Sequence, residues 1–361
     1  MRKWLATLIM LSLLSIFLGV YVGSVSVGPE TVTSGIVHGV KTTLAGWLSS
    51  LSERLGSSLH SGTLMRLSSS LRDVAKEKPP RYFVIVWSLR LPRVLLAYLV
   101  GLSLASAGVA SQALFKNPMA DPYIIGVSGG ASVGAALGMI YAPNYVSIFS
   151  FLFALAAVYV VYSVARVDGR IPIDTLLLAG VAFGFMAGAV TSYLVLTLGP
   201  KAHLTQMWLL GSFNDATWAD VRDVFIVSLA GLSFLLWKWR ELNLLLFGEE
   251  SVALGLDVER FRKEVILVIT VMSGVAVATS GIIGFIGLVG PHIARLLVGP
   301  NHRRLTINAA LLGGILMVLA DLVARIIARP TEIPVGIVTA MMGGPFFLYL
   351  LRKHKRGEMR L

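Results

Sequence analysis

Residues 90–138 read RLPRVLLAYLVGLSLASAGVASQALFKNPMADPYIIGVSGGASVGAALG, and this stretch decides the fold. Two arginines around a proline precede an apolar run of about one membrane thickness. The run pauses at residues 117–122, and a second apolar segment follows. In that segment glycine recurs at every fourth residue, at Gly126, Gly130, Gly134 and Gly138. Four-residue spacing places them on one helix face, where another helix can approach closely. The stretch therefore predicts two tightly packed membrane helices.

The composition of the whole chain indicates an integral membrane protein. Hydrophobic residues make up 56% and charged residues 14%, whereas soluble domains are about a quarter charged. The 361 residues leave room for about ten spans of roughly 20 residues. The absence of cysteine excludes disulfides and thiolate metal ligands. A net charge of +12 is typical of basic cytoplasmic loops, and no RNA- or DNA-binding motif accompanies it, so we expect no nucleic-acid partner.

Ten apolar segments are predicted to cross the cell membrane. They are residues 4–21, 93–113, 123–141, 148–166, 173–198, 219–238, 264–281, 283–298, 306–326 and 335–351. The first is long enough to span and has no clear small-residue cleavage site, which favours a retained helix over a signal peptide. Its basic start places the N-terminus in the cytoplasm. Ten crossings return the C-terminus there, and after residue 140 the predicted outer loops hold few basic residues beyond Lys201 and Arg329. The predicted outer segment 25–89 carries seven basic residues against this rule, which is tolerable because long loops translocate largely regardless of charge.

Residues 25–89 form a long polar segment between the first two spans. Leucines recur within it at helical spacing, at Leu44, Leu48, Leu51, Leu55 and Leu59. This pattern predicts an amphipathic helix in an extracytoplasmic insert, lying against the outer membrane surface or the bundle. A partly disordered insert is the alternative. The role of the insert cannot be read from its residues.

A weak internal sequence similarity relates the two halves of the chain. At an offset of 173 residues, Gly101, Gly108 and Pro118 match Gly274, Gly281 and Pro291. An inverted repeat that pairs helices 2–5 with helices 7–10 would give such a match, as in many transporters. Chance matching in a chain of 36 glycines is the alternative.

Several long motifs together resemble one family. The opening stretch is followed by SGIIGFIGLVGPHIARLLVG at residues 280–299, ADLVAR at 320–325, EIPVG at 332–336 and GGPFF at 343–347. Over roughly residues 85–351 the chain resembles the membrane permease of ABC importers for ferric siderophores, haem or cobalamin. The connection at 25–89 is longer than is general in that family.

The resemblance implies an all-α, polytopic permease, a single transmembrane domain over residues 1–361 that works as a homodimer. Its partners would be two ATP-binding subunits, which carry the ATP and Mg, and an extracytoplasmic binding protein, with lipid around the bundle. The chain itself would hold no cofactor and would not be an enzyme. Which chelate is carried cannot be read from these motifs. An ion-coupled secondary transporter that acts without an ATPase is the alternative.

The loop at residues 239–263 is the predicted cytoplasmic coupling loop. Residues 251–254 with a following Gly255 suggest one short helix, and Asp257 could cap a second short helix that runs through Arg262. An ordinary interfacial linker is the alternative. The resemblance assigns ATPase contact in this loop to Glu249, Glu250, Ser251, Ala253, Leu254, Gly255 and Leu256.

Arginines mark the predicted outer surface. The resemblance maps Arg90, Arg93 and Arg325 onto residues that pair with acidic groups of the binding protein, and a guanidinium suits carboxylate pairing. Asp321 lies one helical turn before Arg325, so an internal ion pair is the alternative.

A second glycine series marks the predicted pathway. Gly180, Gly184 and Gly188 repeat the four-residue spacing, and the resemblance implies that spans five and ten line a channel between two copies. It also implies that Asn117 and Met119 constrict the cytoplasmic end. A tight turn is the alternative for Asn117.

Motifs for bond chemistry are absent from the sequence. The chain has no GxxxxGK[ST] loop for phosphates and no HExxH or close His cluster for a metal. We therefore expect no catalytic residues and no metal site.

Overall fold

The computed structural model describes residues 2–23, 27–55, 82–167 and 169–355. These residues are almost entirely helical, and a single isolated bridge joins Val167 to Arg170. The predicted all-α class is therefore confirmed. The helices are α1 (Arg2–Tyr21), α2 (Pro29–Leu55), η1 (Val84–Arg90), α4 (Leu91–Leu114), η2 (Pro122–Ile125), α5 (Val127–Tyr141), η3 (Pro143–Tyr145), α6 (Val146–Ala165), α7 (Ile173–Thr197), η4 (Gly199–Lys201), α8 (Ala202–Leu209), α9 (Trp218–Trp237), α10 (Trp239–Leu245), η5 (Gly248–Leu254), α11 (Val258–Ser280), α12 (Ile286–Val298), α13 (His302–Ile326) and α14 (Val335–Lys355).

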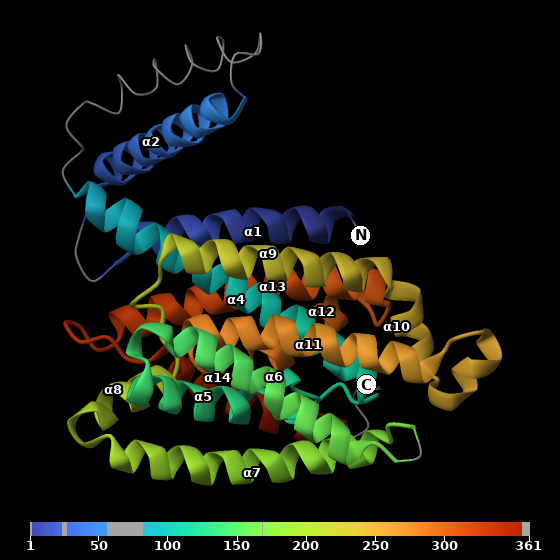
Figure 1. The fold of residues 1–361 in the computed structure, drawn as a ribbon. Coiled ribbons are helices and arrows are strands. Elements are labelled where there is room, and N and C mark those ends of the chain that lie inside the picture. The colour runs from blue at the N-terminus through green and yellow to red at the C-terminus, as the bar shows by residue number, and fades with distance from the viewer. Residues whose placement is uncertain (1, 24–26, 56–81, 168, 356–361) are drawn as a thin grey trace.

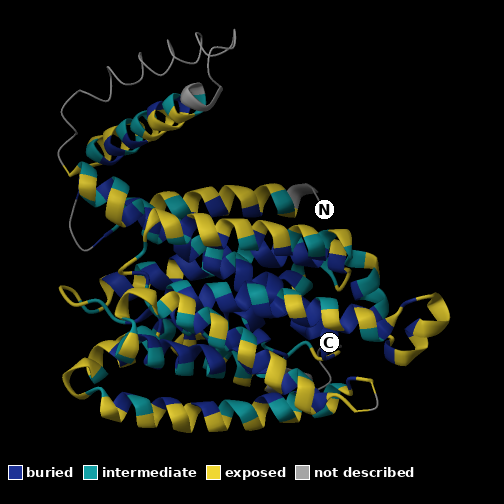
Figure 2. Cartoon of the chain, viewed as in Figure 1, coloured by how far each residue is buried: buried dark blue, intermediate teal, exposed yellow. Residues whose placement is uncertain are grey.

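The long helices lie side by side in a bundle (Figure 1). Helix α4 is in the centre and is mostly buried, with α13, α11, α9 and α12 packed around it. Helix α7 lies at the edge of the bundle and exposes most of its side chains (Figure 2). Because α4 is surrounded by other helices, larger side chains at its glycine, alanine and serine positions would clash with these neighbours.

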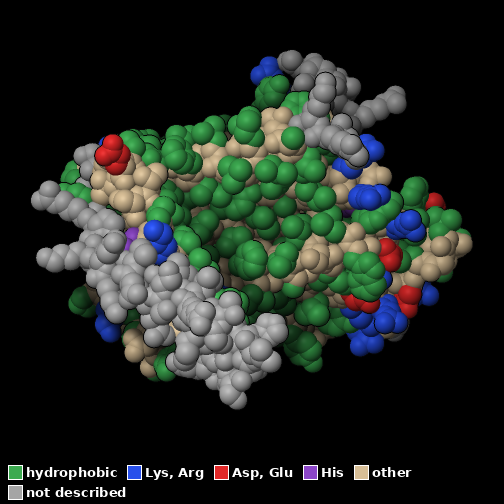
Figure 3. Space-filling view, turned by 90° about the horizontal axis from the view of Figure 1, so that it is seen from above, with side chains coloured by type: hydrophobic (Ala, Val, Ile, Leu, Met, Phe, Trp, Pro, Cys, Tyr) green, Lys and Arg blue, Asp and Glu red, His purple; other side chains and the backbone are tan. Residues whose placement is uncertain are grey.

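Each of the ten predicted spans coincides with a helix. Among the described residues, six segments are long and apolar enough to cross a membrane by length and composition: Trp4–Tyr21, Val84–Leu114, Pro143–Ala165, Ile173–Thr197, Val258–Ser280 and His302–Ile326. Shorter apolar helices occupy Val127–Tyr141, Ile286–Val298 and Val335–Leu350. Figure 3 shows a broad apolar surface, with many of the visible charged side chains near the end that carries η5. The protein is therefore a multi-pass membrane protein, and the count of ten crossings stays a prediction.

Glycines allow the central helices to touch backbone to backbone. A Cβ added at Gly101 of α4 would overlap the carbonyl of Gly313 in α13, and the reverse also holds. One added at Gly108 would overlap the carbonyl of Gly287 in α12. Contacts of this kind give van der Waals packing between helices where lipid supplies no hydrophobic drive.

The first predicted glycine series packs α5 against α6. Added Cβ atoms at Gly130 and Gly134 would overlap the carbonyls of Phe153 and Phe149, and one at Gly138 would lie 3.0 Å from the Cα of Val146. At the start of α5, Gly126 has a φ of +92°, a left-handed conformation that favours glycine.

The second glycine series behaves differently along α7. An added Cβ at Gly180 would overlap the carbonyl of Ile124. At Gly184 and Gly188 it would meet nothing within 4 Å. The Cα of Gly184 nevertheless lies 3.4 Å from a Cβ added at Gly129, so α5 approaches α7 at this residue. Helix packing at Gly188 stays a prediction, because α7 lies at the bundle edge and Gly188 is exposed.

This contrast gives a paired prediction. We expect Gly134→Ala to lower the free energy of unfolding by about 1–3 kcal/mol, because the added methyl group overpacks the α5–α6 contact. We expect Gly188→Ala not to lower it, because the added methyl group meets no neighbour and alanine favours a helix over glycine. Thermal unfolding of the two detergent-solubilised variants measures both values. Equal stability of the two variants would show that the α5–α6 contact tolerates a side chain.

The insert contributes helix α2, which begins earlier than the leucine pattern indicates. Its glycines contact the π-helical segment η1: an added Cβ at Gly35 would lie 3.3 Å from Val86, and one at Gly39 would overlap Trp87. An apolar stripe, Val37, Val40, Leu44 and Trp47, faces outward. Leu59 lies outside the described residues. The extracytoplasmic location of α2 stays a prediction.

The internal similarity at an offset of 173 residues receives no support from the local structure. Pro118 lies in the turn that follows α4, whereas Pro291 lies inside α12. The inverted repeat therefore remains a prediction.

Candidate functional site

A cavity of about 310 Å³ opens at the end of the bundle opposite η5. All three arginines of the predicted docking surface line it, together with Gly23, Ile85, Leu89, Asn214 and Glu332. The structure thus brings together residues 90, 93 and 325, which are far apart in the sequence.

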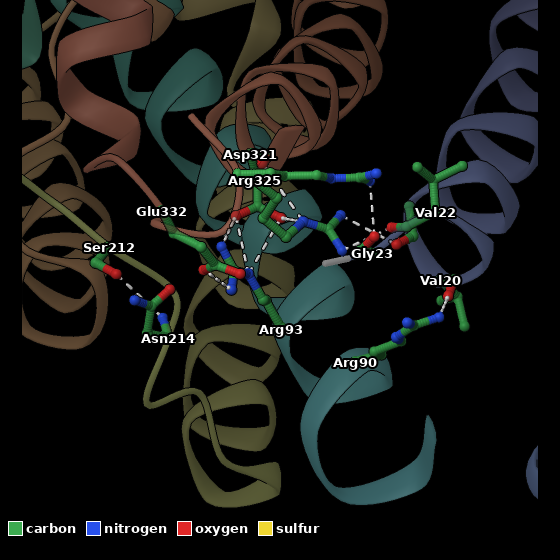
Figure 4. A network of polar contacts seen from close by, with 12 residues as sticks. Val20, Val22, Gly23, Arg90, Arg93, Ser212, Asn214, Asp321, Arg325 and Glu332 are labelled. Atoms are coloured by element: carbon green, nitrogen blue, oxygen red, sulfur yellow. Dashed lines mark hydrogen bonds and ion pairs between the residues drawn. The ribbon is translucent and has the colours of Figure 1, made fainter. Parts of the chain in front are cut away.

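Asp321 is the centre of the charge network in this cavity (Figure 4). Its side chain is 1% exposed. Its Oδ1 accepts a hydrogen bond from Nη2 of Arg93 at 2.8 Å, and its Oδ2 lies 3.0 Å from Nε of Arg325. Glu332 accepts from Nη1 of Arg93 at 2.7 Å. Among the described residues, this network therefore joins Arg93 and Arg325 through two carboxylates.

The same arginines hold the end of α1. Arg325 donates to the carbonyls of Gly19 and Val22 at 3.0 and 2.9 Å, and Arg90 donates to those of Val20 and Tyr21 at 3.2 Å. The last carbonyls of a helix have no partner within the helix. Basic side chains at this end also interact favourably with the helix dipole. The arginines therefore anchor α1 to the bundle.

The internal ion pair considered from the sequence is present and extends further than expected. Arg325 pairs with Asp321, and Arg93 joins the same carboxylate. The guanidinium groups of Arg90 and Arg325 are buried. Docking of a binding protein at these three arginines stays a prediction, and any such partner would meet a network that is already paired. The contribution of Glu332 was not recognised from the sequence, although it begins the EIPVG motif.

The predicted coupling loop forms a lobe, residues 246–257, that projects from the bundle (Figure 1). The short helix η5 ends at Gly255, which has a φ of +84°. The prediction of a second short helix is wrong: Asp257 caps α11, which continues to Ser280. No stop signal follows Arg262, so the first turn simply continues into the membrane span.

Side chains of the lobe divide into two groups. Ser251 and Leu256 are buried and pack within the protein. The exposed group consists of Glu249, Glu250, Ala253, Leu254 and Gly255, with Leu246, Phe247 and Val252 alongside. Leu254 is 62% exposed. Exposed apolar patches of this kind are typical of interaction sites, and contact of this lobe with an ATPase stays a prediction.

Arg262 fixes the lobe to the bundle and was missed from the sequence. This side chain is 6% exposed and lies 3.0 Å from Glu249 of η5 and 2.7 Å from Glu259. It also donates to the carbonyl of Ile171 at 3.3 Å. Glu249 is 13 residues before Arg262, so the three- or four-residue spacing of helical ion pairs does not predict this contact.

The turn after α4 lies against the lobe. Oδ1 of Asn117 accepts a hydrogen bond from the backbone N–H of Met119 at 2.9 Å, which closes a tight turn, the alternative considered above. Lys116 reaches from this turn to the backbone of Gly248 in η5. Asp121 ends the turn and accepts from the N–H of Tyr123. Its carboxyl is half-buried, and the resulting desolvation raises its pKa to about 6. A gating role for Asn117 and Met119 stays a prediction.

Metal-binding groups are not assembled in the part of the chain that the structure describes. It contains no group of three or more His, Cys, Asp or Glu side chains that could hold a metal ion.

Comparison with known proteins decides the class. Residues 10–353 match the profile of the FecCD transport family. The chain belongs to the FecCD transport family. A cobalamin import permease of Halobacterium salinarum is 42% identical over 346 residues, which is 91% of each chain. A hemin transport permease of Yersinia pestis is 37% identical over 82% of this chain and 92% of its own length.

A solved structure agrees with this assignment. A metal-chelate type ABC transporter in an inward-facing conformation matches 98% of this chain and 99% of its own, with a TM-score of 0.76 and 28% sequence identity. This FecCD member is therefore a permease subunit of an ABC importer, which works with separate ATP-binding subunits and dimerises. The ion-coupled alternative is disfavoured.

Proposed function

We propose that this FecCD permease imports a metal chelate, with cobalamin the favoured cargo among cobalamin, haem and ferric siderophores. The family match over residues 10–353 carries the importer assignment. The extent of one match favours cobalamin, because the similarity to the Halobacterium cobalamin permease covers 91% of this chain, against 82% for the hemin permease.

The orientation follows from charge. We propose that the lobe and both termini are cytoplasmic, because basic residues are enriched on the cytoplasmic side of membrane proteins. Arg166, Arg170, Lys238, Arg240 and Arg260 belong to loops or helix ends on the side of the lobe. The arginine cavity would then open to the outside.

Coupling would take place at the lobe. The exposed apolar side chains of Val252 and Leu254 suit a groove on an ATP-binding subunit, which would hold the ATP and Mg. The buried Ser251 and Leu256 would shape the lobe rather than touch the partner. Because Arg262 joins the lobe to α11, movement of the lobe would reach the bundle.

The outer cavity would receive the extracytoplasmic binding protein. The guanidinium groups of Arg93 and Arg325, with Arg90 beside them, line the cavity and suit acidic groups on that partner. A partner carboxylate would have to share or replace Asp321 and Glu332, which would couple docking to the α1 anchor.

Two copies would enclose the pathway. Helix α7 exposes Gly188 together with large apolar side chains, and α14 exposes Met341 and Met342. We propose that these faces meet across the dimer, with Asn117 and Met119 near the cytoplasmic end.

Transport by the complete system tests this proposal. The permease is reconstituted with its ATP-binding subunit and binding protein, and uptake of cyanocobalamin, hemin and a ferric siderophore is measured with and without ATP. We expect ATP-dependent uptake of cyanocobalamin. Uptake of another cargo alone would overturn the cobalamin assignment but leave the importer, whereas ion-driven uptake without the ATPase would overturn the importer.

The anchor of the lobe gives a further prediction. Arg262→Met removes the charge that pairs with Glu249 and Glu259 but keeps a long apolar stem. We expect ATP hydrolysis to continue while cargo uptake falls about tenfold, which corresponds to about 1.4 kcal/mol of lost coupling. Arg260→Met, at an exposed surface pair with Glu264, is the control and should leave uptake near wild type. Equal uptake by the two variants would contradict the role of Arg262.

A further inference from the structure

Helix α11 presents one exposed ridge between two apolar grooves. Leu267 forms the ridge and is 60% exposed. On one side a groove of about 260 Å³ separates α11 from α6, and on the other side a groove of about 290 Å³ separates α11 from α9. The first is lined by Leu155, Val158, Tyr159, Tyr162, Lys263, Ile266, Leu267 and Thr270, and the second by apolar side chains and Gly231. Leu267 belongs to both linings.

A cation lies at one end of this paired groove. Lys263 is four residues before Leu267, so the two side chains share a helix face about 6 Å apart along the axis. Lys263 is exposed. In the described part of the chain it has no ion-pair partner, whereas its neighbour Arg260 lies 3.3 Å from Glu264.

The tyrosines of the first groove agree with the position of a membrane surface. Tyr159 is 71% exposed, and Tyr162 lies one turn closer to the end of α6 that faces the lobe. Tyrosine is enriched where the hydrocarbon meets the headgroups. A membrane surface at the level of these tyrosines would place Lys263 at headgroup depth, with both grooves running toward the membrane interior.

Two grooves of similar volume beside one ridge, with a lysine at one end, match the form of a phospholipid. We propose that this face binds one anionic phospholipid in the leaflet on the side of the lobe, with its phosphate at Lys263 and its two acyl chains on either side of Leu267. Basic pockets between membrane helices on the cytoplasmic side bind anionic headgroups in this way. Charge complementarity selects an anionic lipid over a zwitterionic one, because no acidic side chain lines either groove.

Native mass spectrometry of the full chain tests the site. The protein is purified in mild detergent and exposed to phosphatidylglycerol or phosphatidylcholine of the same chain length. We expect one phosphatidylglycerol to be retained in preference to phosphatidylcholine. In Lys263→Ala this preference should fall about fivefold, the effect of one basic residue near an anionic surface. Lys263→Arg should keep it.

A second variant tests the grooves apart from the charge. Ala230 lines the α9 groove and is exposed, so Ala230→Phe fills that groove without crowding the core. We expect Ala230→Phe to lose retained lipid of either headgroup while the chain keeps its helical content. Lys201→Ala, at an exposed lysine at the opposite end of the bundle, is the control and should bind as wild type does.

Three results would overturn the proposal. They are equal retention of the two lipids by the wild type, wild-type retention by both Lys263→Ala and Ala230→Phe, and loss of a dimer rather than of lipid in Ala230→Phe. The last result would assign this face to a second copy of the chain. None of these readouts depends on transport, so the lipid site can fail while the proposed import function stands.

Discussion

Leu254→Glu is expected to abolish both cargo uptake and cargo-stimulated ATP hydrolysis while the permease still inserts and folds. Leu254 is 62% exposed on the lobe, so a charge there does not disturb the core. If this leucine is seated in a groove of the ATP-binding subunit, a buried unpaired carboxylate would cost at least about 2 kcal/mol of binding free energy, as for an interface hot spot. Co-purification with the ATP-binding subunit and uptake by reconstituted vesicles measure the two effects.

Leu254→Met is the matched control for this experiment. It keeps the apolar character and nearly the volume of the side chain, so assembly and uptake should stay close to wild type. Wild-type uptake by Leu254→Glu would refute contact between this part of the lobe and the ATP-binding subunit. If the complex assembles but uptake is lost, the lobe transmits movement without providing much of the binding energy.

The helices of this protein could be predicted because lipid leaves the backbone few choices. A segment in the hydrocarbon region must satisfy its own hydrogen bonds, so a long apolar run such as residues 173–198 has to be a helix. The predicted segment and helix α7, Ile173–Thr197, differ by one residue at the C-terminal end. The same reasoning cannot say which helices are central, because α4 and α7 are similarly apolar and only packing distinguishes them.

Glycine spacing predicts a face but not its neighbour. Gly134 and Gly188 belong to series with the same period, yet one contacts α6 and the other faces open space. Which face of a helix contacts another helix depends on how the helices are arranged in the bundle. The four-residue spacing of the glycines does not specify that arrangement. An open glycine face on one copy is, however, where a second copy could approach.

The charge networks could be predicted only in part. The pair Asp321–Arg325 spans one helical turn and is visible as a spacing. Arg93 and Asp321 are 228 residues apart, and their contact exists because α4 and α13 pack at Gly101 and Gly313, about two helical turns away. Long-range pairs of this kind follow from the fold and not from local sequence.

Asp321→Ala is expected to be the most destabilising single change in the outer cavity. It leaves the guanidinium groups of Arg93 and Arg325 without their shared carboxylate in a buried site. Removing one partner of a buried ion pair typically costs about 3–5 kcal/mol. Thermal unfolding of the detergent-solubilised chain should therefore show a large loss. Asp223→Ala removes an exposed pair with Arg222 and should leave the unfolding temperature near that of the wild type.

The arginines can be assigned to anchoring or to docking by measuring two quantities on the same variant. Arg325 donates to two carbonyls near the end of α1 and pairs with Asp321, so an anchoring role requires that Arg325→Gln lower the unfolding temperature of the permease alone. A docking role alone requires an unchanged unfolding temperature and weaker affinity for the binding protein. We expect Arg325→Gln to lower both the unfolding temperature and the affinity for the binding protein. A partner carboxylate that reaches the cavity must compete for the same guanidinium group that holds α1.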